Sequence, residues 1–405
     1  MSSPSLNDPL TLPCGVTLPN RIAKAAMSEH LGSPKQSPTR GLARLYERWS
    51  AGGAGLLITG NVMVDQAHLE APSNVAVKPD SDISRFRDWA AAGTTHGNHL
   101  WMQLNHPGRQ TPRHINPHPA APSAADPVHL FRRAKAFGKP HAMDEDEIGQ
   151  AIRSFASAAV FAKAAGFTGV QVHGAHGYLV SQFLSPLTNQ RSDRWGGPLE
   201  NRARFARTVL AEIRKVVGDE FPVAIKLNSA DFQRGGFTEA ESMRVLETLE
   251  EDGVDLVEIS GGSYESRVML DKVQNNREAF FLEYAKKARV EVHIPMMVTG
   301  GMRTRSLMQE ALRSGALDLV GMARPFTNNP HIARDLLEGR TNRAEDPPVM
   351  PGLRRLGGTS QAMMSVAQMG LLAKGKSPTL RFGGLRSVFA ALVQESAGLF
   401  KSKRP

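Results

Sequence analysis

Short apolar segments suited to buried strands alternate with amphipathic helical segments along most of this chain. The segments that read as strands are "RIAKAAM" (21–27), "GLLITGNVMV" (55–64), "HLWMQL" (99–104), "GVQVHG" (169–174), "PVAIKL" (222–227), "LVEISG" (256–261), "PMMVTG" (295–300) and "LDLVGMA" (317–323). A strand followed by a helix, repeated in this way, is typical of α/β proteins with a parallel sheet. Eight such units predict a single (β/α)8 TIM barrel in preference to an open doubly wound sheet.

The helical segments carry their own end signals. Residues 144–166 begin with a run of acids, repeat apolar residues at Ile148, Ile152 and Phe155, and end on a glycine, as expected of a core-facing helix. Thr238 and Glu241 have the spacing of a capping box. We also expect a small hairpin from "LTLPCGVTLPN" (10–20), ahead of the first barrel strand, and a loop insertion over residues 105–143.

The C-terminal segment differs from the rest of the chain in charge. Residues 351–405 contain nine Lys or Arg residues and one acid, so this segment accounts for +8 of the formal net charge of +10. We therefore predict a barrel over residues 1–340 and a basic C-terminal extension over 341–405. The apolar stretch "QAMMSVAQMGLLAKG" predicts that the extension is helical and docked on the barrel. Because the basic charge is confined to the tail, no nucleic-acid partner is expected.

Composition excludes several classes of protein. No apolar run reaches the roughly 18 residues that a transmembrane helix needs, and the N-terminus lacks the apolar region of a secretory signal. Cys14 is the only cysteine, which excludes an internal disulfide, a Cys-ligated iron–sulfur cluster and a structural Cys-zinc site. We expect a cytoplasmic protein without a membrane partner.

Polar side chains follow the predicted strands where each strand ends. In a barrel of this kind the chemistry lies at the C-terminal ends of the strands, so these residues predict an enzyme. They are Ser28, Asn61, Gln103, His106, His173, His176, Lys226, Asn228, Ser260, Gly301 and Arg324.

The stretch "QVHGAHGYLVSQFL" (171–184) places His173, His176 and Tyr178 close together. The two histidines could bind a metal, but the same loop contains no acid, and the candidate third ligands Glu258 and His106 are distant in sequence. They could also be buried histidines with a structural role. Tyr178 weakens both interpretations because it adds a third hydrogen-bond donor at the same rim.

Glycines and an arginine end the last two predicted strands. Gly300 and Gly301 permit close backbone approach, and Arg324 offers a bidentate clamp, so we expect a phosphate here. Lys226 on the inner rim suits either a Schiff base or a charge partner for a cofactor. "GLLAKGKS" (370–377) matches a P-loop, but a helical segment precedes it and Pro378 follows, so we regard the match as accidental.

Several longer motifs together resemble the Old Yellow Enzyme family of FMN-dependent ene-reductases, also called NADH:flavin oxidoreductases. The resemblance covers about residues 8–340. Its motifs are "LPNRIAKAAM", "GLLITGNVMV", "QLNHPGRQ", "HGAHGYLVSQFLSPLTNQRSDRWGGPLENRARF", "EISGG" and the Gly/Arg phosphate pair. It implies one FMN across the mouth of the barrel, held by residues that match the family's flavin contacts: Met27, Ser28, Gly60, Gln103, Lys226, Gly301, Ala323 and Arg324.

The resemblance also implies roles for the residues of the central motif. His173 and His176 match the pair that binds a carbonyl or nitro oxygen of the substrate, and Tyr178 matches the proton donor. NADH or NADPH would bind first and leave before an electrophilic alkene enters, which gives a ping-pong mechanism. Ser28 stands where many relatives have Cys or Thr, which leaves its effect on the flavin potential open.

Three other functions fit the sequence less well. The first is a flavin NADH oxidase that passes electrons to O2, and the second is a cofactor-free barrel lyase or isomerase that uses Lys226. The third is a binding protein with a basic tail and an inactive barrel. The sequence does not determine the physiological substrate, the choice between NADH and NADPH, the role of the extension or the oligomeric state, and it allows a homo-oligomer.

Overall fold

The structure is a computed structural model that describes residues 3–126, 136–263, 265, 278–348 and 357–379. Its centre is a closed barrel of eight parallel strands, as predicted, because β3 pairs with both β13 and β4. The barrel strands, in chain order, are β3 (Ile22–Lys24), β4 (Leu56–Met63), β6 (His99–Asn105), β9 (Gly169–Gly174), β10 (Val223–Asn228), β11 (Leu256–Ser260), β12 (Met296–Thr299) and β13 (Leu319–Met322).

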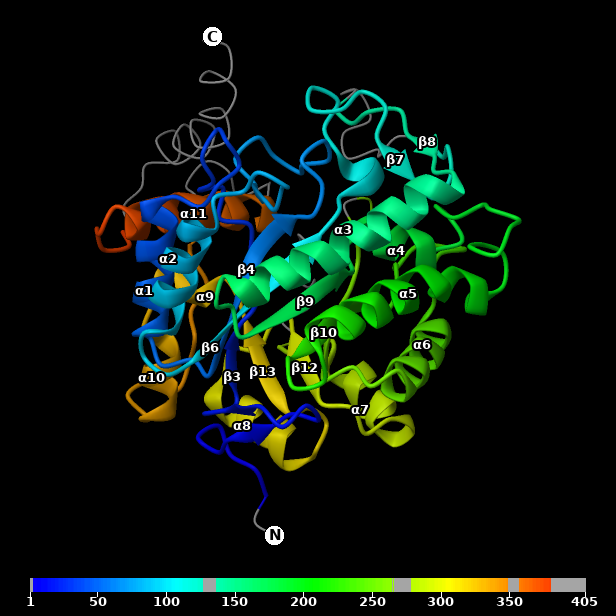
Figure 1. The fold of residues 1–405 in the computed structure, drawn as a ribbon. Helices are drawn as coiled ribbons and strands as arrows, with labels where there is room; N and C mark the ends of the chain where they lie inside the picture. The colour runs from blue at the N-terminus through cyan, green and yellow to red at the C-terminus, as the bar shows by residue number, and fades with distance from the viewer. Residues whose placement is uncertain (1–2, 127–135, 264, 266–277, 349–356, 380–405) are drawn as a thin grey trace.

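Helices surround the barrel on the outside (Figure 1). Their N-caps include side chains expected from the sequence: Asp144 and Thr238 each form a complete capping box. The helices are α1 (Arg40–Ser50), α2 (Ile83–Thr94), α3 (Glu145–Ala164), α4 (Leu179–Leu184), α5 (Leu199–Val217), α6 (Glu239–Glu251), α7 (Leu282–Glu291), α8 (Arg305–Arg313), α9 (Pro325–Asn328), α10 (Ile332–Leu337) and α11 (Gly357–Ala373).

The N-terminal hairpin covers one end of the barrel. β1 (Leu10–Thr11) pairs antiparallel with β2 (Thr17–Leu18), and this dark blue segment lies at the bottom of Figure 1. Its leucines, among them Leu10 and Leu18, share a buried cluster with Trp101 and other side chains of the barrel strands. The opposite end, where the strands finish, is thereby left for the polar loops.

The loop insertion after β6 contains short elements of its own. A 3-10 turn, η1 (Gly108–Gln110), is followed by β7 (Ala120–Ala121), which pairs with β8 (His141–Ala142). A further short strand, β5 (Val75–Ala76), pairs with the end of β4. Both additions lie at the C-terminal rim of the barrel, where β4 and β6 end.

Helix α11 packs against α1 and α9 and begins beyond residue 340. Ala373 O accepts a 3.0 Å hydrogen bond from Arg44 on α1, and Leu372 is fully buried. Gly370 and its neighbours lie inside this helix, so "GLLAKGKS" has no strand before it and is no P-loop. The two-part division of the chain stays a prediction, and most of the basic tail lies outside the described residues.

Removing the side chain that anchors α11 should destabilise the protein. Leu372 has no exposed surface, so Leu372→Ala should lower the free energy of unfolding by at least about 2 kcal/mol through lost burial and the cavity left behind. Denaturant unfolding measures this change, and Lys374→Ala, at an exposed position two residues on, is the matched control. Equal stabilities of the two variants would mean that α11 does not pack in solution as it does here.

Candidate active site at the C-terminal rim of the barrel

His173, His176 and Tyr178 converge at the rim, where β9 ends. The His173 ring lies edge-on to both other rings, with centroid distances of 5.0 Å to His176 and 4.8 Å to Tyr178. His173 and Tyr178 are each 4% exposed. The structure thus brings together the three residues that the central motif predicted.

Hydrogen bonds define the proton position on one of these histidines. The backbone N–H of Ala175 donates to His173 Nδ1 over 3.3 Å, so a neutral His173 carries its proton on Nε2. Burial, together with the nearby charges of His176 and Lys226, lowers the pKa of His173 well below its ordinary value. His173 is therefore neutral at neutral pH and offers an N–H donor.

His176 is held in an unusual backbone conformation. Its φ of 61° lies in the left-handed region that costs a non-glycine residue free energy. Asn228 accepts its N–H over 3.1 Å and Gln110 donates to its C=O over 3.0 Å. These bonds hold the backbone of His176, and its ring Nε2 lies 2.8 Å from Ser260 Oγ. Burial, and then the charge of Lys226, lowers the pKa of His176 well below its ordinary value, so this ring is also neutral.

Glu70, from the loop between β4 and β5, contacts Tyr178 at the rim. The sequence motifs did not predict this residue. Its Oε2 accepts hydrogen bonds from the Tyr178 hydroxyl, over 2.6 Å, and from the Asn61 amide. Its Oε1 accepts from the Ser28 hydroxyl and, over 3.5 Å, from Asn74. Because one hydroxyl proton serves one acceptor, Ser28 donates to Glu70 here and would have to turn to donate to a bound flavin.

A buried ion pair and two amides line the interior of the barrel below the rim. Lys226 Nζ lies 2.9 Å from Glu258 Oε1, and both residues are almost completely buried. Gln171 donates to the other oxygen of Glu258 over 2.9 Å and accepts from Gln103 over 2.7 Å. Lys226 is therefore tied to a carboxylate, which counts against its use as a Schiff-base nucleophile.

Gly60 and Met27 lie beside Glu29 rather than on an open surface. The N–H of Gly60 donates to Glu29 Oε1 over 2.8 Å. A Cβ on Gly60 would meet Glu29 Oε2 at 2.2 Å and the Met27 carbonyl oxygen at 2.5 Å. The close approach explains the glycine, and it also shows that the Gly60 N–H already has an acceptor.

Two arginines share one carboxylate where β12 and β13 end. Arg303 and Arg324 lie 2.7 Å and 3.7 Å from oxygens of Asp346. Arg324 also donates to Gln361 on α11 over 2.7 Å. Burial lowers the pKa of Arg324, and the charge of Asp346 opposes this effect. The sequence had identified Arg324 but neither Arg303 nor the contact with the C-terminal helix.

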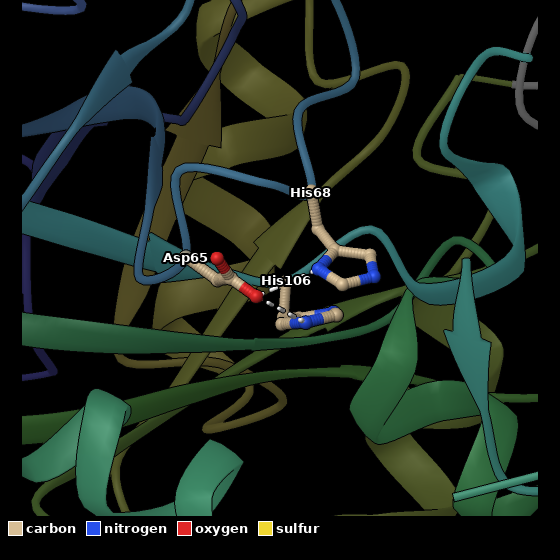
Figure 2. A group of neighbouring side chains, drawn as sticks. All are labelled: Asp65, His68 and His106. Atoms are coloured by element: carbon tan, nitrogen blue, oxygen red, sulfur yellow. Dashed lines mark hydrogen bonds and ion pairs between the residues drawn. The ribbon is translucent and has the colours of Figure 1, made fainter. Parts of the chain in front are cut away.

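The described residues contain one group of three side chains with metal-ligating atoms, Asp65, His68 and His106, whose ligating atoms lie within 4.8 Å of one another (Figure 2). His68 Nδ1 lies 2.6 Å and His106 Nε2 3.7 Å from Asp65 Oδ2. The structure thus pairs His106 with Asp65 and His68, whereas the sequence had left it open as a ligand beside His173 and His176.

The remaining ring nitrogens show why this group suits a hydrogen-bond cluster better than a metal. The Ala120 N–H donates to His68 Nε2, and the Gly108 N–H donates to His106 Nδ1, each over 3.1 Å. The nitrogens that face Asp65 therefore carry the protons, whereas metal-bound histidines donate from the nitrogen away from the metal. Burial lowers the pKa of His106 to about 4. Burial would raise the pKa of Asp65, but the hydrogen bonds from His106 and His68 hold it far below its ordinary value.

A family model and a related sequence indicate the same family of proteins. Residues 5–343 match the model of the NADH:flavin oxidoreductase / NADH oxidase family. The NADH-dependent flavin oxidoreductase iliE of Hypocrea jecorina (strain QM6a) is 36% identical over 355 residues, which are 81% of this chain and 88% of that protein.

Two solved structures share the fold of this chain. The old yellow enzyme homologue from Zymomonas mobilis superposes with a TM-score of 0.73 and 25% identity, covering 89% of this chain and 99% of that one. A 2-naphthoyl-CoA reductase gives a TM-score of 0.77 and 27% identity over 83% of this chain, which spans only 52% of that longer protein. In the described part of this chain, no helix is long and apolar enough to cross a membrane.

Proposed function

Because the chain belongs to the NADH:flavin oxidoreductase / NADH oxidase family, in which FMN and NAD(P)H are the cofactors, we propose that it reduces the activated C=C bond of α,β-unsaturated carbonyl or nitro compounds. The observation that carries this proposal is the convergence of two neutral histidines and a tyrosine at one point of the rim. Three hydrogen-bond donors in a buried site suit an acceptor oxygen and an adjacent carbon that must receive a proton.

The residues at the ends of β12 and β13 have the chemistry of a phosphate site. Arg303 and Arg324 both contact the Asp346 carboxylate, and among the described residues the buried Arg303 Nε has no hydrogen-bond partner. Gly300 and Gly301 have φ values of 139° and 79°, which L side chains rarely adopt, and a Cβ on Gly301 would meet Ala279 N at 2.9 Å. This donor set fits the FMN phosphate.

The polar side chains inside the barrel suit the flavin ring, which is the other end of FMN from the phosphate. Lys226, Gln103 and Gln171 provide an ammonium group and two amides, which suit the alternating donors and acceptors of a flavin ring edge. The FMN would supply hydride to the β-carbon of the substrate after reduction by NAD(P)H. Met27, Ser28, Gly60 and Ala323 complete the predicted contacts.

The roles of the rim residues follow from their hydrogen bonds. His173, with its proton on Nε2, donates to the substrate oxygen, and His176 assists from the neighbouring position. This polarises the C=C bond and stabilises negative charge on the oxygen. Tyr178 gives its hydroxyl proton to the α-carbon. NAD(P)H and the alkene use the same site in turn, which predicts ping-pong kinetics.

Loss of the Arg324 side chain should weaken FMN binding. One charge-assisted contact is worth roughly 1.5–3 kcal/mol, so Arg324→Ala should bind FMN about tenfold to a hundredfold more weakly. Fluorescence titration of the apoprotein with FMN measures the affinity. Arg340→Ala, which removes an exposed arginine paired with Asp335 and Glu338, is the control. Equal FMN affinity in the two variants would contradict the phosphate assignment.

Reoxidation decides between the proposed reaction and electron transfer to O2. Enzyme reduced by NADH under anaerobic conditions should be reoxidised rapidly by cyclohexenone. Rapid reoxidation by O2 and none by enones or nitroalkenes would favour the NADH oxidase function that the family also includes.

A further inference from the structure

The Glu70 carboxylate is a proton-exchanging group in direct contact with Tyr178, and the mechanism above does not use it. The Tyr178 hydroxyl donates to Glu70 Oε2 over 2.6 Å. Asn61, Ser28 and Asn74 donate to the same carboxylate. These four donors hold the Glu70 carboxylate against the Tyr178 oxygen.

Tyr178 needs a source of protons in every turnover. It is 4% exposed, and once it has protonated the substrate it would remain as a buried tyrosinate, a costly charge in such an environment. Glu70 touches the hydroxyl and is only partly buried, so solvent has access to this residue.

We propose that Glu70 supplies the proton that Tyr178 transfers, so that the two residues act as a relay from solvent to the substrate. This inference rests on the proposed alkene reduction. The Tyr178 O–H bond breaks as the new C–H bond forms at the α-carbon, whose electron pair comes from the enolate-like substrate. Water protonates the Glu70 carboxylate once the tyrosinate forms beside it, because a neighbouring negative charge favours proton uptake. The O–H bond of this carboxyl then breaks as Tyr178 regains its proton, which restores the Glu70 carboxylate that accepts from the Tyr178 hydroxyl.

The surrounding hydrogen bonds keep the two members of the relay together. Asn74 Oδ1 accepts the N–H groups of Glu70 and Ala71, over 2.9 Å and 2.8 Å, which turns the Asn74 amide nitrogen toward the Glu70 carboxylate. The loop that carries Glu70 also contains Asp65, which the cluster of Figure 2 ties to His106.

His106 also anchors the other member of the relay. Its carbonyl oxygen accepts the N–H of Leu179 over 2.9 Å, at the start of α4 directly after Tyr178. The cluster of Asp65, His68 and His106 therefore positions Glu70 and Tyr178 relative to each other.

Separate measurement of the two half-reactions tests the relay. Glu70→Gln keeps the size of the side chain and one of its two acceptor oxygens, but its amide nitrogen cannot accept a hydrogen bond and cannot pass on a proton. In stopped-flow experiments on the FMN-loaded enzyme, it should slow reoxidation by cyclohexenone about tenfold to a hundredfold, within the range of general-acid effects. Reduction by NADH should stay within about twofold, because it needs no proton from Tyr178. Glu200→Gln, an exposed glutamate on α5, should change neither rate.

Two further variants separate proton supply from a structural role. Formate added to Glu70→Ala should restore enone reoxidation in proportion to its concentration, which an unfolded or displaced loop would not allow. In a Tyr178→Phe background, Glu70→Gln should cause no further loss, because the relay has already lost the member through which Glu70 acts.

Infrared spectroscopy checks the contact without any turnover. The difference spectrum between the protein and Glu70→Gln isolates the carboxyl bands of Glu70, and Tyr178→Phe should shift them. Unshifted bands, or an unimpaired enone reaction in Glu70→Gln, would overturn the relay. An equal loss in both half-reactions without formate rescue would overturn it in favour of a structural role. Failure of the unmodified enzyme to react with enones would instead overturn the proposed function, and the infrared result would still decide the contact.

Discussion

Tyr178→Phe is expected to slow reoxidation of the reduced enzyme by cyclohexenone by about 10²–10⁴-fold, the usual range for loss of a general acid. The hydroxyl is the only group removed, and the ring that packs edge-on against His173 remains, so folding and FMN binding should be kept. Stopped-flow absorbance of the flavin measures the rate, and bleaching by NADH should be nearly normal because it requires no proton from this residue.

The histidines provide the contrast for this prediction. His173→Ala and His176→Ala remove groups that bind the substrate oxygen, so they should weaken the binding of phenolic inhibitors as well as turnover. Undiminished enone reduction by Tyr178→Phe would mean that another group donates the proton. Equal slowing of both half-reactions would indicate that Tyr178 is structural.

Lys226→Met should destabilise the apoprotein by roughly 3–5 kcal/mol, the usual cost of breaking a buried ion pair. Lys226 Nζ lies 2.9 Å from Glu258 Oε1, and Glu258 is fully buried. Without the ammonium group this carboxylate keeps the hydrogen bond from Gln171 but has no paired cation. Urea unfolding of the protein freed of FMN measures the loss.

A second substitution serves as the control for the ion pair. Glu258→Gln in the Lys226→Met background removes the unpaired charge and leaves an amide of nearly the same shape beside Gln171. This double variant should regain most of the lost stability, because neutral replacements of buried pairs are well tolerated. A double variant as unstable as Lys226→Met would show that packing, and not the lost charge partner, dominates at this position.

The barrel could be predicted from the sequence because its signals are local. The run 169–174 coincides with β9 and the run 256–261 covers β11, since strands buried on both faces are rich in apolar, β-branched residues. Thr238 and Glu241 form their capping box within one turn of helix. The resemblance to a flavin enzyme family was likewise carried by uninterrupted motifs, and the family is confirmed.

The site residues that were missed are those whose meaning depends on distant partners. Glu70 and Tyr178 are separated by 108 residues along the chain, and no pattern around Glu70 indicates a buried partner. The pairing of β4 with β6, and of β6 with β9, brings the loop after β4 near the end of β9. In the same way, Arg324 gains its contact with Gln361 through the packing of α11.

The sequence by itself therefore determined the order of strands and helices, the end of the barrel that carries the chemistry, and the family. The tertiary structure alone decided which protons and charges meet there: His173 protonated on Nε2, His106 paired with Asp65, and Glu70 in contact with Tyr178. The physical reason is the distance along the chain over which each kind of signal acts. Hydrophobic periodicity and helix caps depend on residues that are near one another in the chain. The protonation and orientation of a buried side chain depend on groups that only the pairing of distant strands brings within a few ångströms.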